Sequence, residues 1–144
     1  MASSLKIWYI ISMEKTNPLY VPALDGIDYT QEDLDFFLCG AFEGGSSYWI
    51  DAVEYGSPRP KGIEYFWESI TRGGSLIIEY GSEEEEENKK ELTQETFLKG
   101  LEIFFTKYFS KPKNKKETFD FADLDANDSD LVLQYSLFEE EIYC

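Results

Sequence analysis

Apolar residues recur at helical spacing in four parts of the chain, and two of these parts end at a pair of glycines. After Thr30 the apolar positions repeat every three or four residues, and Asp33 is placed to complete a capping-box variant with Thr30. This helix is expected to end at Gly44-Gly45, and a second one, over residues 63–72, at Gly73-Gly74. We expect Gly44 and Gly73 to adopt positive φ, as glycines at helix ends commonly do.

The other two helical patterns lie in the second half of the chain. Residues 92–109 carry the strongest apolar stripe, directly after Thr93 as N-cap. A fourth helix is expected from Asp125 to about Phe138.

Four shorter stretches have the alternating or continuously apolar character of strands, namely residues 5–13, 46–56, 75–81 and 140–144. Together these patterns predict an α+β fold in one small domain, residues 1–144, with about four strands and three to four helices. The stretch 5–13 is too short to cross a bilayer, so no membrane partner is expected.

Two charged segments interrupt the regular patterns. Residues 81–90, which include five consecutive glutamates, are expected to form an acidic mobile loop, and residues 110–117 a basic loop. The lysines in and near the basic loop are expected to be solvated and to neutralise acidic groups of the same molecule.

The chain is strongly acidic but is not predicted to be disordered. It has 29 acidic and 13 basic residues, a formal net charge of −16, and no histidine. Since 42% of its residues are hydrophobic and 17% aromatic, it can bury a core. Direct binding of nucleic acid requires clustered Lys and Arg, so we expect no nucleic-acid partner and instead a basic protein.

Groups that carry catalysis are sparse. The chain has no histidine, no serine nucleophile elbow and no phosphate-binding loop. The spacing of Cys39 and Cys144 fits no metal site, and free thiols suit a reducing cytoplasm. Paired carboxylates for acid and base work are available, but no pair is singled out. We expect a binding protein without cofactor or metal rather than an enzyme.

The acidic stretch "DFADLDANDSDLVLQ" invites comparison with a calcium loop. Asp128 stands where such a loop needs Gly and Gln134 where it needs a bidentate Glu, so the pattern indicates no metal site. Asp125 is better placed to cap the last helix together with Asp128. The remaining acids, Asp120, Asp123 and Asp130, with Glu139 further on, are candidates for a recognition surface.

Three blocks, "GAFEGGSSYW", "ITRGGSLII" and "DLDANDSDLVLQYSLFEEEIY", resemble a family of small uncharacterised proteins of bacteriophages and other mobile elements, with the pattern "ALEGGSNYW", then "RGG", then "DADDADxxxQYALFGExVYG". The chain departs from this pattern where Gly is expected at Glu139 or Glu140, in its N-terminal extension and in its glutamate run. The resemblance implies no activity. It implies a setting in which small acidic proteins often occupy a host protein.

Two hypotheses result. The first is a cytoplasmic acidic protein that binds a basic partner, such as a host nuclease or its complex, and inhibits a nucleic-acid-directed defence system as an anti-CRISPR or anti-restriction protein, in the manner of a nucleic-acid mimic. The second is a protein that binds a small ligand or sequesters a nucleotide in an aromatic pocket formed by Tyr48, Trp49, Tyr65 and Trp67.

Overall fold

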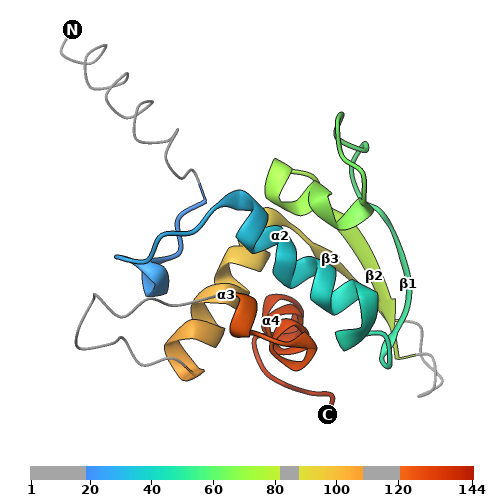
Figure 1. Ribbon diagram of the computed structural model, residues 1–144. Helices are drawn as coiled ribbons and strands as arrows, with labels where there is room; N and C mark the ends of the chain where they lie inside the picture. Colours follow the sequence, from blue (N-terminus) through green and yellow to red (C-terminus); the bar gives the residue numbers. More distant parts are fainter. Residues whose placement is uncertain (1–18, 82–87, 109–120) are drawn as a thin grey trace, which may run out of the picture.

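The helices of the molecule gather around a small antiparallel sheet, as the α+β prediction requires (Figure 1). The computed structural model describes residues 19–81, 88–108 and 121–144. In chain order the helices and strands are η1 (Pro22–Leu24), α2 (Gln31–Gly40), η2 (Ala41–Gly45), β1 (Ile50–Tyr55), η3 (Phe66–Arg72), β2 (Leu76–Tyr80), β3 (Asn88–Leu92), α3 (Gln94–Tyr108), η5 (Phe121–Asp123) and α4 (Ala126–Phe138).

Three helices begin where the sequence predicts. The Thr30 hydroxyl accepts from the Asp33 amide at 3.1 Å, and the Asp33 carboxylate accepts from the Thr30 amide at 2.8 Å. Asp125 and Asp128 form the same reciprocal pair at the start of α4. At α3 the Thr93 hydroxyl accepts from the Thr96 amide at 3.1 Å. Each pair satisfies amides that a helix N-terminus leaves unbonded, so the predicted caps are confirmed.

Within the described residues the sheet has the order β1-β2-β3 with antiparallel neighbours. Leu76 on the central strand pairs with Tyr55 of β1 and with Leu92 of β3. Leu76 and Ile78 are fully buried, whereas Ile77 between them is only partly buried. One face of β2 therefore contributes to the core.

One loop prediction, in its last three residues, and one strand prediction are wrong. β3 begins at Asn88, inside the segment 81–90 that was expected to be a loop, because its backbone pairs with β2 although most of its side chains are polar and exposed. Residues 140–144 form no strand; they fold back along α4 and are held by side chains. The predicted strand at 5–13, residues 82–87 of the predicted acidic loop and the basic loop at 110–117 lie outside the described residues.

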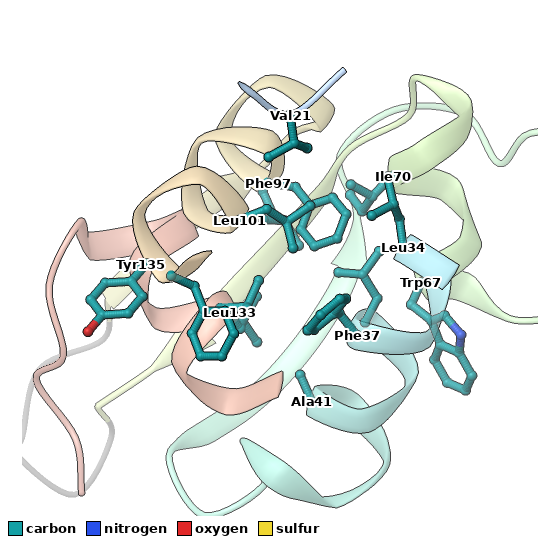
Figure 2. Close-up of a cluster of buried hydrophobic side chains, with 14 of the residues drawn as sticks. Val21, Leu34, Phe37, Ala41, Trp67, Ile70, Phe97, Leu101, Leu133 and Tyr135 are labelled. Carbon is teal, nitrogen blue, oxygen red and sulfur yellow. The ribbon is translucent and has the colours of Figure 1, made fainter. Parts of the chain in front are cut away.

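The core joins α2, α3, α4, η3 and the sheet (Figure 2). The Phe37 ring of α2 meets three other phenylalanine rings edge to face, those of Phe104, Phe105 and Phe121, with centroids 5.8–6.4 Å apart. Such T-shaped pairs add to the free energy gained from burying the rings. These ring contacts join α2 to α3 and η5, which come from the second half of the chain, in one core.

The two diglycine pairs serve different purposes. Gly73 has φ 88° at the end of η3, as predicted for a left-handed C-cap. Gly44 has φ 174°, which is extended backbone, so the left-handed conformation predicted for it is wrong. The helix ends instead in a π turn, where a Cβ on Gly45 would lie 2.3 Å from the Ala126 carbonyl oxygen of α4. Gly45 is needed because η2 and α4 approach each other closely.

Candidate functional site

A buried carboxylate, Asp130 of α4, collects hydrogen bonds from two distant parts of the chain. Its Oδ1 accepts from the Ser46 hydroxyl at 2.7 Å and from Trp49 Nε1 at 2.8 Å. Its Oδ2 accepts from the Tyr48 hydroxyl at 2.8 Å and from Gln134 Nε2 at 3.1 Å. We call these five residues the Asp130 network.

The local sequence explains how the network forms. The close approach of Gly45 to Ala126 brings the turn after η2, which carries Ser46, Tyr48 and Trp49, against the start of α4. On α4, Asp130 and Gln134 are four residues apart and therefore lie on the same helix face. The contact between Gly45 and the start of α4 thus fixes how the turn after η2 is placed along this helix.

Gln134 also fixes the end of the chain. Its Oε1 accepts from the amides of Ile142 and Tyr143, each at 2.8 Å, and its Nε2 donates to the Tyr143 carbonyl oxygen at 3.1 Å. Gln134 itself is fully buried, so these bonds satisfy a side-chain amide that water cannot reach. They replace the strand pairing that the sequence predicts for this segment.

Aromatic rings close one side of the network. The Trp49 ring stacks on that of Tyr143, with centroids 5.1 Å apart and planes inclined by 6°. Phe138 and Tyr80 pack against Trp49 from the end of α4 and from β2. The indole is thereby fixed by rings from three elements while its N–H points at Asp130.

No lysine or arginine of the described residues forms an ion pair with Asp130. Its negative charge is spread over four neutral donors. Burial and the hydrogen bond to Asp130 raise the pKa of Tyr48 well above its usual value, which keeps the phenol protonated as a donor.

A cavity of about 340 Å³ lies beside the network, lined by Tyr48, Asn127, Asp130, Leu131, Glu141 and Cys144. Residues from the turn before β1, from α4 and from the C-terminal segment therefore meet around one space.

Of the four acids predicted to form a recognition surface, the three that the structure describes do not share one. Asp130 is 7% exposed and fully engaged in the network, so its assignment to the surface is wrong. Asp123 is exposed just before α4, whereas Glu139 is exposed after its last turn and pairs with Lys99 at 3.2 Å. Asp120 lies outside the described residues.

The four predicted pocket aromatics form two separate pairs. Tyr48 lines the cavity, while Trp49 is buried behind it in the Asp130 network. Tyr65 stacks on the buried Trp67 at η3, with centroids 4.7 Å apart and planes inclined by 3°. Neither Tyr65 nor Trp67 lines the cavity beside Asp130.

Three members of the site went unnoticed as site residues in the sequence: Ser46, Gln134 and Tyr143. All three lie in the first and third blocks of the phage-type pattern, together with Tyr48, Trp49 and Asp130. The structure brings these two blocks into contact. The hydroxyl and amide residues beside aromatic ones in these two blocks were the available signal.

In the part of the chain that the structure describes, no group of acidic or cysteine side chains is arranged to hold a metal ion. No helix there is long and apolar enough to cross a membrane. Comparisons with protein-family models, with curated proteins and with solved structures give no match to this chain.

Proposed function

We propose that this protein binds a basic protein through an acidic patch at the N-terminal end of α4. The patch consists of the exposed residues Glu43, Asp123, Asp125 and Glu141. The observation that carries the proposal is that two segments without any lysine or arginine, residues 16–58 and 117–144, contact each other here through their described parts, η2 and α2 on one side and α4 on the other.

The fold brings the residues of the patch to the same end of α4 although they are distant in sequence. Glu43 is two residues from Gly45, which approaches Ala126 of α4. Asp123 and Asp125 directly precede that helix, and Glu141 lines the same cavity as Asn127 of its first turn.

Nothing in the described part of the chain neutralises this charge. None of the four ion pairs between described residues involves a member of the patch. Negative charge that forms no ion pair with a described lysine or arginine, on a protein of net charge −16, favours association with a basic surface and accelerates it.

The partner we propose is a cytoplasmic protein of a host cell with a basic nucleic-acid-binding groove, such as a nuclease of a CRISPR or restriction system. A groove that binds phosphates presents clustered Lys and Arg, and an acidic protein that covers it competes with nucleic acid. The setting comes from the resemblance to proteins of mobile elements.

Sequestration of a nucleotide is less well supported. The cavity beside Asp130 is lined by two carboxylates, Asp130 and Glu141, and by no lysine or arginine. Phosphate groups would be repelled there.

The test compares two variants of equal net charge. In the patch variant Glu43→Gln, Asp123→Asn and Glu141→Gln are combined, and Asp125 is kept because it caps α4. The matched control combines Glu64→Gln, Glu91→Gln and Glu95→Gln, three exposed acids outside the patch, in the loop before η3, on β3 and on α3.

Each protein is used to capture partners from a bacterial lysate, and the captured protein is then purified and titrated at several salt concentrations. We expect the patch variant to bind at least about tenfold more weakly, equivalent to about 1.4 kcal/mol, with a shallower salt dependence. The control should remain near wild type, and the wild type should displace nucleic acid from the partner. Equal losses in both variants, or none in either, would refute the proposal.

A further inference from the structure

The cavity beside Asp130 combines negative charge with an aromatic and an aliphatic wall. Its lining includes two carboxylates, of which Asp130 is buried and Glu141 exposed, and no lysine or arginine. Tyr48, whose side chain is half exposed, and Leu131, which is partly buried, supply the apolar surface. Negative charge in a concave site concentrates the field and favours a cation.

The occupied oxygens of Asp130 decide what kind of cation can enter. Each oxygen already accepts two hydrogen bonds, which uses the lone pairs that a bare metal ion would need. An organic cation needs no such bond to Asp130, because it can be attracted at a distance and donate to the free oxygens of Glu141 and Asn127. The cavity volume of about 340 Å³ is near the lower limit of small-ligand sites, roughly 300–1,000 Å³.

We propose that this cavity receives the side chain of one arginine of the basic partner. A guanidinium is weakly hydrated, stacks on aromatic rings such as that of Tyr48, and presents several donors in one plane. Its aliphatic stem can contact Leu131. This inference rests on the proposed function, since it makes the cavity the anchor point within the acidic patch.

The test uses a small probe and needs no partner. N-acetyl-arginine amide is titrated into the full-length protein and followed by amide chemical shifts, with N-acetyl-citrulline amide as its uncharged analogue of nearly equal shape. We expect millimolar binding of the arginine probe, shifts concentrated at Tyr48, Asn127 and Leu131, and at least about fivefold weaker binding of citrulline.

Two single variants of identical charge change supply the control. Glu141→Gln alters a cavity residue, and Glu140→Gln alters its exposed neighbour, which does not line the cavity. We expect Glu141→Gln to weaken the arginine probe about five- to tenfold and Glu140→Gln less than twofold.

Equal binding of citrulline, equal effects of the two variants, or shifts that map away from the cavity would overturn the arginine site. Failure of this site is distinguishable from failure of the proposed function. The probe titration reports on the cavity alone, whereas the patch and control variants report on partner binding whether or not an arginine enters the cavity.

Discussion

This protein has two helix–diglycine–strand units, and each is held by a carboxylate from another element. One carboxylate accepts only from neutral donors, whereas the other also forms an ion pair. The first unit, from α2 through η2 to β1, is held by the buried carboxylate of Asp130 through neutral donors. The second, from η3 to β2, is held by Asp35 of α2 at the rim. There the Thr71 hydroxyl donates to Asp35 and Arg72 forms an ion pair with it at 3.3 Å.

The contrast shows how burial selects the partner of a negative charge. At the rim, a guanidinium can pair with Asp35 and still keep contact with water, since the Arg72 side chain is 32% exposed. In the interior a buried cation would itself require desolvation, and fixed hydroxyl, indole and amide donors replace it. We expect the interior arrangement to contribute more to stability, and three predictions test this comparison.

The largest effect is expected from Asp130→Asn. The new amide nitrogen must face either the Trp49 indole N–H or the Nε2 group of Gln134, and neither of these nitrogens can accept a hydrogen bond. The unpaired donors should lower the free energy of unfolding by about 2–3 kcal/mol, measured by urea denaturation followed through tryptophan fluorescence. A loss below about 1 kcal/mol would mean that the network is not a major stabilising element.

Replacing Gly45 or Gly73 by alanine is expected to have an intermediate effect on stability. The physical cause differs between the two units. In Gly45→Ala the new Cβ would lie 2.3 Å from the Ala126 carbonyl oxygen, so η2 and α4 must move apart, at about 2 kcal/mol. In Gly73→Ala the Cβ meets nothing within 4 Å, and only its φ of 88° opposes the change, at about 1 kcal/mol.

Gly44→Ala is the control for this pair, because a Cβ there also meets nothing within 4 Å and φ is not in the left-handed region. Thermal unfolding of the three variants should rank Gly45→Ala as least stable and Gly44→Ala as closest to wild type. The reverse order of Gly45→Ala and Gly44→Ala would contradict the close approach of η2 to α4.

The smallest effect is expected from Asp35→Asn. Burial raises the pKa of Asp35 despite its bonds to Thr71 and Arg72. Its ionisation at neutral pH is therefore no gain in stability, and the variant should differ from wild type by less than about 1 kcal/mol.

The sign of its pH dependence follows from the same shift. A carboxyl group with a raised pKa in the folded state binds its proton more tightly there than in the unfolded chain, so its contribution is largest at low pH and is lost as the pH rises through the folded pKa. Wild type should thus gain stability relative to Asp35→Asn as the solution is acidified. If the free energies of unfolding of the two proteins changed in parallel with pH, burial would not raise the pKa of Asp35.

Structural features that depend on residues close together in the sequence were predictable. The capping pairs at Thr30 and Asp125, the cap at Thr93 and the left-handed Gly73 depend on residues within one turn of each other, and all are confirmed. The α+β class followed from hydrophobic spacing in the same way.

Features that depend on distant residues were not predictable. β3 has polar side chains and exists because β2 offers its backbone as a partner. The C-terminal segment has the sequence pattern of a strand, but the backbone N–H groups of Ile142 and Tyr143 donate to the side-chain oxygen of Gln134 instead of to another strand. Asp130 looks like one more surface aspartate because three of its four donors, Ser46, Tyr48 and Trp49, lie 81–84 residues away from it along the chain.

The composition of the outer strands bears on how this protein behaves at high concentration. In the described part of the sheet, β1 and β3 are the edge strands, and they expose Asp51 and Glu54 on one side and Lys89, Lys90 and Glu91 on the other. An open strand edge is a template on which a second molecule can add its own strand, and charged side chains are the usual deterrent to such fibre-like growth. The apolar central strand β2, with Leu76 and Ile78, is paired on both sides and is never the template. A chain this rich in aromatic residues is thereby expected to remain dispersed in concentrated solution.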